Sequence, residues 1–418
     1  MPPHSSDAQN MAPTILFLNH NLAGQATYFR NLNFAKGLAG LGWKATVMTV
    51  APQQSLRVRL EQDSGVRIIR TPWILPSAFL AGNGCDPWDI LFRCLWCGTH
   101  RVDITVVSDH LFNVSLPFFV SRSLRRSSGY LADWADLFTR GGCHAAWVHG
   151  LRRPFYALSH YLEFYNKRVC DLAMATSRPL LRLLQTDCGK HPDRTIHLPS
   201  GCDPTFEFEP DTLPTRNILG IDPVDFVVGR TGRTGIAGRL HPHEQEAFLA
   251  LHHHLLSRGM PAPLLYLVGN HDVSWYPELV GSGCRLKISG LLPSMEVPKH
   301  LRACDVFMLL EADTPFNRHR GPIRLNDYLV VGRPILCNSV GDHSETLTKA
   351  QAGLVWDDLS CVSVEVAELL SDHQLRRAMG SNARRLAENE LSWPNLASRL
   401  DHFLLEHFPQ LRDRSHGA

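Results

Sequence analysis

Short apolar runs alternate with amphipathic stretches along the first half of the chain. The apolar runs predict buried strands at residues 14–18, 45–50, 66–69, 104–107 and 172–175. Stretches with helical spacing lie between them, at residues 26–41 and near 87–98, 112–125, 150–169 and 178–187. Because strands that alternate with helices form parallel sheets covered on both faces, the first half is expected to be a doubly wound α/β domain.

The second half repeats this alternation after a segment rich in proline, glycine and aspartate at residues 198–214. We predict strands at residues 225–228, 264–268, 286–289, 306–310, 335–338 and 353–356. Helices are predicted at 243–256, near 361–370 and 372–388, and after Trp393. The sequence therefore indicates two Rossmann-like domains, with a disordered tail before them and a final helix that packs back on the first domain. The expected bounds are 1–12, 13–203, 204–393 and 394–418.

The composition of the 418-residue chain excludes several classes of protein. A net charge of +2 gives no general affinity for nucleic acid, so an anion must be bound by locally placed Arg and Lys. Eleven cysteines follow no regular framework, which favours free thiols in a reducing compartment and hence a cytoplasmic protein. No apolar run reaches the length that a membrane-spanning helix needs.

Glycine-bearing turns between a strand and a helix suit phosphate, because backbone N–H groups can approach it there. Gly24 lies before the first long helix, where the alternative is a plain tight turn. A glycine-rich run that begins at Gly229 carries Arg230, Arg233 and Arg239. Guanidinium groups suit a diphosphate, and the alternative is a solvated basic loop.

A third turn of this kind lies between Gly321 and Asp358, a segment that reads as helix, strand, glycine turn, short helix and strand. Its polar side chains near the expected sheet edge are Arg324, Asp327, Asp342 and Glu345. The segment is therefore expected to place a helix N-terminus and charged groups beside a phosphate-bearing ligand.

Polar residues also follow two strands of the first half. His110 comes just after the strand at 104–107, where side chains point toward the ligand crevice of a doubly wound sheet. The alternative is a surface histidine beside a helix-capping aspartate. Asp133 and Trp134 follow a further short strand and could bind and stack on a sugar, although core packing is the commoner fate of tryptophan.

Several short motifs follow one another in a fixed order along the chain. They are GWKATVMT at 42–49, LPSGCD at 198–203, LVG at 267–269, ISG at 288–290, LRACDVF at 301–307, PIRLNDYLVVGRP at 322–334, GDHSE at 341–345 and SW at 392–393. Together they resemble the motifs of retaining glycosyltransferases of family 4, over nearly the whole chain. The resemblance implies the GT-B fold, in which an N-terminal acceptor domain and a C-terminal nucleotide-sugar domain face each other across a cleft.

The resemblance also implies roles for individual residues. His110 would lie near the transferred sugar, and Arg233 and Arg239 would stabilise the diphosphate, with Arg230 a rival for the first of these places. The remaining donor-binding positions would be Gly24, Gly269, Leu291, His319, Arg324, Asp327 and Glu345. Asp133 and Trp134, chosen for their position after a strand and not from the resemblance, are the predicted acceptor-binding residues.

The chain departs from the family pattern at the pair of glutamates that seven residues separate. Asp327 fills the second place, which usually holds the ribose, and His319 falls on the first, where a carboxylate normally contacts the sugar. No lysine matches the one that holds the diphosphate in the family. The sequence also contains no Asp-x-Asp motif to hold Mg²⁺ on a diphosphate, so neither a metal nor another cofactor is expected.

The resulting hypothesis is metal-independent transfer of a hexose-type sugar from a UDP- or GDP-linked donor to an acceptor hydroxyl. Retention of configuration is expected from the family, with no dedicated general base. Two alternatives stay open: a non-catalytic protein that binds a nucleotide sugar or a partner, and a nucleotide-sugar epimerase. Aromatic residues at 155, 156, 161, 164 and 165 could form an acceptor or weak membrane-surface patch, or could pack in the core.

Overall fold

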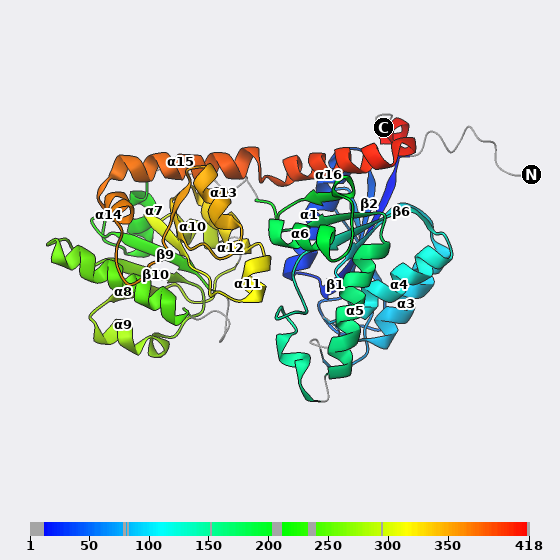
Figure 1. Ribbon diagram of the computed structural model, residues 1–418, viewed down its shortest axis with the longest axis horizontal. Coiled ribbons are helices and arrows are strands. Elements are labelled where there is room, and N and C mark those ends of the chain that lie inside the picture. Colours follow the sequence, from blue (N-terminus) through cyan, green and yellow to red (C-terminus); the bar gives the residue numbers. More distant parts are fainter. Residues whose placement is uncertain are drawn as a thin grey trace, which may run out of the picture. The chain divides into compact units, whose positions relative to one another are not determined.

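The computed structural model describes residues 12–77, 81, 83–150, 153–202, 211–232, 240–293 and 296–415. The chain divides into two compact units, and each is built on one β-sheet (Figure 1). The first unit runs to Ser200 and adds His319–Gly321 and the chain from Trp393. The second comprises Gly201–Arg318 and Pro322–Ser392. The predicted α/β class with two Rossmann-like domains is confirmed.

The sheet of the first unit has the strand order β3-β4-β2-β1-β5-β6-β7-β8. Its strands are β1 Thr14–Leu22, β2 Lys44–Val50, β3 Arg59–Asp63, β4 Val66–Thr71, β5 Val102–Ser108, β6 Ser127–Trp134, β7 Leu172–Ala175 and β8 Thr195–His197. All neighbours are parallel except β3 and β4. The chain adds β2 on one side of β1 and later β5 on the other. The switch point of this doubly wound sheet therefore lies at the carboxyl ends of β1 and β5.

Helices cover both faces of this sheet. On one face, α1 (Ala26–Gly40) and α16 (Trp393–His407) share a core with the sheet. They approach closely, since a Cβ at Gly37 would lie 2.3 Å from the Cβ of Ala397. The opposite face carries α3 Pro87–Thr99, α4 Phe112–Ser123, α5 Arg153–Val169 and α6 Arg178–Thr186. The final helix thus packs on the first unit.

The sheet of the second unit is parallel throughout, with the order β11-β10-β9-β12-β13-β14. Its strands are β9 Val227–Thr231, β10 Leu264–Val268, β11 Arg285–Ile288, β12 Val306–Leu309, β13 Ile335–Cys337 and β14 Gly353–Val355. The described helices are α7 Leu213–Leu219, α8 Pro242–Ser257, α9 Pro277–Gly281, α10 Val297–Leu301, α11 Pro315–His319, α12 Ile323–Val331, α13 His343–Lys349, α14 Val364–Ser371 and α15 His373–Asn389. Here the switch point lies between β9 and β12.

Two sequence-based expectations need correction. The strand predicted at 225–228 is β9, which continues to Thr231, so Gly229 and Arg230 belong to the strand and not to a loop. A Cβ at Gly229 would lie 2.5 Å from Cys304 Sγ, so close packing explains this glycine. The edge strand β3 was not predicted, because its sequence RLEQD is polar and mostly exposed.

All eleven cysteines are unpaired. No helix in the described part of the chain combines the length and apolar character that crossing a bilayer requires.

Candidate active site

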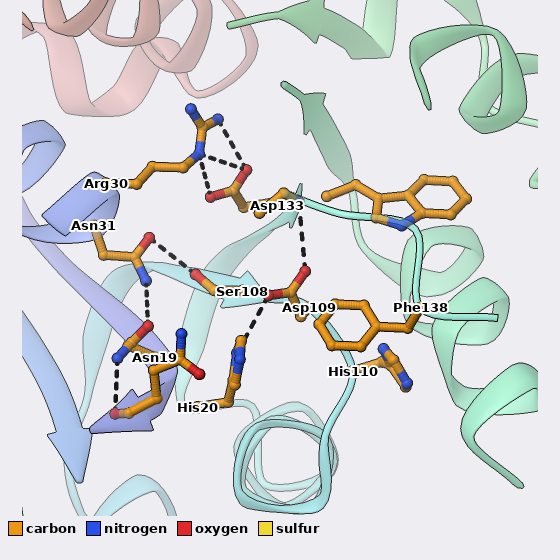
Figure 2. Close-up of polar contacts among 12 residues, drawn as sticks. Asn19, His20, Arg30, Asn31, Ser108, Asp109, His110, Asp133 and Phe138 are labelled. Atoms are coloured by element: carbon orange, nitrogen blue, oxygen red, sulfur yellow. Dashed lines mark hydrogen bonds and ion pairs between the residues drawn. The ribbon is translucent and has the colours of Figure 1, made fainter. Parts of the chain in front are cut away.

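Polar side chains gather at the switch point of the first sheet. β1 is apolar at its start and turns polar at Asn19 and His20, and β5 ends in Ser108, which Asp109 follows. Asn31 of α1 donates from Nδ2 to Asn19 Oδ1 at 3.3 Å, and Ser108 Oγ donates to Asn31 Oδ1 at 3.1 Å (Figure 2). These buried hydrogen bonds fix α1 to the ends of both strands.

An imidazole–carboxylate pair, His20 and Asp109, lies at the same point (Figure 2). Nδ1 of His20 is 3.2 Å from Oδ2 of Asp109, and both side chains are buried. Asp109 has a φ of 66°, a left-handed conformation that costs free energy in a residue other than glycine and often marks a functional site. The two atoms are within ion-pair distance but do not meet hydrogen-bond geometry, and a carboxylate beside Nδ1 of an imidazole is one element of a general-base arrangement.

Asp133, a predicted acceptor-binding residue, is held in an ion pair with Arg30. Nε of Arg30 donates to Oδ2 at 3.0 Å and Nη2 donates to Oδ1 at 3.0 Å. The guanidinium also donates to the carbonyl oxygens of Leu198 and Pro199. Burial raises the pKa of Asp133, although Arg30 opposes the shift. Because its side chain is buried and bound by Arg30, the predicted sugar contact of Asp133 is wrong, and the residue joins α1 to β6.

Asp136 is a second carboxylate at this edge, two residues beyond the end of β6. It is half-buried. Burial and the negative charge of Asp109 raise the pKa of Asp136 to about 7, although Arg320 and Arg30 oppose the shift. A carboxyl group that titrates near neutrality can give or accept a proton at physiological pH, so Asp136 joins the candidate site.

His110 and Trp134 lie inside the first unit. Nε2 of His110 is 2.7 Å from Ser159 Oγ, and its ring packs edge-on against Phe138 at 4.9 Å. Burial, reinforced by the charge of Lys167, lowers the pKa of His110 well below its usual value, so the ring is neutral. Nδ1 of His110 is buried and makes no hydrogen bond within the described residues. The role of His110 beside a sugar stays a prediction.

Trp134 is fully buried, and its Nε1 donates to Glu163 at 3.1 Å. Core packing, the alternative considered for this residue, is therefore confirmed, and stacking on an acceptor sugar is wrong. Glu163 also accepts from the backbone N–H groups of Phe138 and Thr139. This buried carboxylate thereby fixes the loop that carries Asp136.

Gly24 lies in the turn between β1 and α1, with a φ of 91°. A Cβ there would meet nothing within 4 Å, so the backbone conformation alone calls for glycine. The N-cap residue Gln25 makes no side-chain capping hydrogen bond, and the first turn of α1 has no acidic residue. The geometry suits an anion at the start of α1, the place predicted for the donor phosphate.

The switch point of the second sheet holds two buried ion pairs. Arg230 in β9 pairs with Glu244 of α8 at 3.2 Å, and Arg324 of α12 pairs with Glu311, which follows β12, at 2.7 Å. Arg324 Nη1 also lies 3.9 Å from Glu244. Burial disfavours the charge of Arg324, but Glu311 and Glu244 outweigh it and raise its pKa. Arg230 and Arg324 were predicted to bind the diphosphate or the donor, but carboxylates already offset their positive charges.

Two glycine turns meet beside this ion-pair cluster. A Cβ at Gly269, which has a φ of 139°, would lie 2.1 Å from the carbonyl oxygen of Gly232. Gly232 N–H donates to the carbonyl of Val268 at 3.0 Å. Nδ1 of His271 forms a hydrogen bond with the hydroxyl group of Tyr276. Burial lowers the pKa of His271 to about 4. Gly269 therefore lets the ends of β9 and β10 approach closely, whether or not it also contacts a donor.

The other predicted donor-binding residues are dispersed. Leu291 is exposed, and Glu345 is half-exposed in an ion pair with Lys349. Burial raises the pKa of Asp327 to about 7. The carbonyl oxygen of His319 accepts from Ser177 Oγ at 2.5 Å, within the first unit. His319 ends α11, whose other residues belong to the second unit, and it is grouped with the first unit. Arg233 and Arg239 lie outside the described residues.

Proteins of known structure share this two-unit architecture. Sucrose-phosphate synthase from Thermosynechococcus elongatus is 16% identical, with a TM-score of 0.68 over 95% of this chain and 99% of that chain. HepE of Anabaena, solved with UDP, is 15% identical, with a TM-score of 0.63 over 95% of this chain and 100% of its own. α,α-Trehalose 6-phosphate synthase from Burkholderia multivorans is 12% identical, with a TM-score of 0.64 over 97% and 99%. The chain has the GT-B fold. No protein-family model and no curated protein sequence matches it.

Sequence reasoning missed His20, Asp109 and Asp136. His20 and Asp109 are 89 residues apart, and only the adjacency of β1 and β5 brings them together. One signal was available, because each residue stands at or just after the polar end of an apolar strand. A search for polar residues at the ends of the two strands that flank the switch point would have found His20 and Asp109.

Proposed function

We propose that the chain is a glycosyltransferase that moves a sugar from a nucleoside diphosphate to an acceptor hydroxyl. The observation that carries this proposal is the His20–Asp109 pair at the switch point of the first sheet, with Asp136 beyond the end of the neighbouring strand β6. These groups can manage the proton of an attacking hydroxyl. The fold supports the same function, since HepE, which shares it, was solved in complex with UDP-glucose.

The finer features of the proposal follow from the sequence. The donor is a UDP- or GDP-linked hexose, bound without a metal by the second unit. Arg233 and Arg239 neutralise the diphosphate, because Arg230 and Arg324 are already paired with carboxylates. Asp327, for which no hydrogen bond or ion pair is found in the described part of the chain, holds the ribose hydroxyls. Reaction without a metal then depends on guanidinium groups and helix N-termini to stabilise the leaving diphosphate.

Retention of configuration is the proposed stereochemical course, with the leaving phosphate accepting the hydroxyl proton. The His20–Asp109 pair favours a second course. In this course His20 Nε2 takes the proton from the acceptor hydroxyl while the oxygen attacks the anomeric carbon. The bond to the diphosphate breaks, the diphosphate leaves with the electron pair, and the configuration inverts. The two courses differ in product and in their need for a base.

Donor binding tests the proposal first. Thermal shifts of the full chain with a panel of nucleotide sugars identify the donor, and mass detection of products with hydroxyl acceptors then identifies transfer. The anomeric configuration of the product, read by NMR, separates retention from inversion. A donor-induced shift without product across the acceptor panel would favour the non-catalytic alternative. Isotope exchange at the sugar without any acceptor would favour an epimerase.

A further inference from the structure

Helices α3, α4 and α5 form one layer on the first sheet, and their inner sides share a core with it (Figure 1). α3 touches α4 at Gly98, where a Cβ would lie 3.3 Å from Val120. α4 touches α5 where the rings of Phe119 and Tyr165 lie 5.9 Å apart. On the opposite face of the sheet, α1 and α16 pack against each other and share a core with the strands.

The outer side of this layer is apolar. Leu95 of α3 is 61% exposed, Leu124 just after α4 is 52% exposed, and Phe155 and Tyr161 of α5 are 58% and 57% exposed. We call this surface the three-helix face, and its main apolar residues are Leu91, Leu95, Leu124, Phe155, Leu158 and Tyr161. Single exposed apolar residues are ordinary, but a set spread over three adjacent helices marks an interaction surface.

The charges on these helices are of one sign. The only carboxylates within α3, α4 and α5 are Asp89 and Glu163, and both are fully buried. The exposed charged residues of these helices and their ends are arginines, namely Arg101, Arg122, Arg125, Arg153 and Arg168, of which Arg168 donates to the carbonyl oxygen of Asp187 and lies near its carboxylate. An apolar surface that carries basic but no acidic groups is complementary to a layer of anionic headgroups over hydrocarbon.

We propose that the three-helix face docks the chain on a membrane surface that contains anionic lipid. The leucine and aromatic side chains enter the boundary between headgroups and acyl chains, and the arginines meet lipid phosphates. The small net charge of the whole chain does not oppose this, because the attraction is local to the face. The inference stands apart from sugar transfer, since the face lies on helices that contribute none of the candidate site's proton-transfer groups.

Sedimentation of the full chain with vesicles tests the proposal. We expect binding to vesicles of mixed phosphatidylcholine and phosphatidylglycerol, weaker binding to phosphatidylcholine alone, and loss of binding as salt rises. The double variant Leu95→Glu/Phe155→Glu should bind the mixed vesicles at least about tenfold more weakly. The double variant Arg122→Gln/Arg125→Gln should lose binding chiefly at low salt.

Val364→Glu is the matched control. Val364 of α14 is exposed, but it lies beside the exposed Glu365 and Glu368, so its replacement should leave vesicle binding unchanged. Thermal unfolding confirms that each variant folds. Absence of binding to mixed vesicles at low salt would overturn the proposal. So would equal binding by the face variants and the control, or a dimer that Leu95→Glu disperses, since a second copy would then cover the face. Neither result affects the donor-induced thermal shift, which tests sugar transfer separately.

Discussion

The ratio of positive to negative side chains differs between the switch points of the two sheets. In the second unit, Arg230 and Arg324 face Glu244 and Glu311, so two positive charges meet two negative ones. In the first unit, Arg30 compensates Asp133, while Asp109 lies beside the imidazole of His20 and accepts from the backbone N–H of Ala135, and the pKa of Asp136 is raised to about 7. The same topology thus supports a closed ion-pair cluster in one unit and titratable groups in the other.

This difference separates structural from chemical roles. A buried carboxylate offsets the field of the guanidinium it pairs with, so the pair attracts a diphosphate only weakly. Removing either partner leaves an isolated buried charge. A histidine paired with a carboxylate can instead change its protonation state within a catalytic cycle. We therefore expect substitutions in the first unit to affect turnover and substitutions in the second unit's cluster to affect stability.

The largest expected effect comes from removing the imidazole of His20. His20→Gln should lower kcat by roughly 10²–10⁴-fold if the pair acts as the general base, because the acceptor proton then has no partner. Asp109→Asn should have a smaller effect of the same sign, and asparagine tolerates the left-handed φ of 66° at this position. Turnover with the identified donor and acceptor measures both.

A donor-induced thermal shift in the His20→Gln variant provides the control, since the proposed ribose contact, Asp327, belongs to the second unit. If the variant keeps full turnover and the product retains its configuration, the pair is structural and the leaving phosphate takes the proton. Equal loss of folding and turnover would also argue against a catalytic role.

The next effect should appear in the stability of the second unit. Glu244→Gln removes the negative charge that faces the buried guanidinium of Arg230. We expect the free energy of unfolding to fall by about 3–5 kcal/mol. Denaturant unfolding measures this loss. Glu296→Gln breaks the exposed pair with Lys299 and should cost less than about 1 kcal/mol, which makes it the matched control.

Asp136 should produce a smaller, pH-dependent effect. Its pKa is about 7 in the folded chain against 3.8 for an ordinary aspartate, so the folded state holds a proton that the unfolded state releases. Stability is therefore lost as pH rises from about 4 to about 7 and stays lost above. Asp136→Asn cannot ionise and should raise the free energy of unfolding by about 1–3 kcal/mol at pH 8, after allowance for partial exposure. An advantage that does not grow between pH 4 and pH 8 would contradict the shifted pKa.

The periodicity of the sequence predicted most of the fold. The strand at 264–268 coincides with β10, and the segment from Gly321 to Asp358 has the predicted order of elements. Apolar runs report burial, so strands buried on both faces were visible. The exposed edge strand β3 and the three-residue β8 carry no such run, and the sequence offered no signal for them.

The candidate site was less accessible to sequence reasoning. Asp133 and Trp134 were assigned to the acceptor because they end a strand, but their partners Arg30 and Glu163 come from helices far along the chain. Whether a polar residue serves structure or chemistry depends on such distant partners. Sequence spacing does not reveal them, so three of the groups now proposed for proton transfer were found only in the folded chain.

Substitution of Glu345 should have the smallest effect on stability, so it best separates donor binding from stability. Glu345 forms an ion pair with Lys349 at 2.5 Å along α13, and both side chains are at least half exposed. Such pairs contribute about 0.3–0.5 kcal/mol, so Glu345→Gln should leave thermal unfolding almost unchanged. If Glu345 contacts the donor, as the sequence predicts, the same variant should lose donor affinity by an amount that the broken pair cannot explain. Lys349→Gln breaks the same pair from the other side and should leave donor affinity intact. Parallel losses in both variants would instead assign Glu345 to the helix alone, and the second unit would then bind its ligand through groups other than this carboxylate.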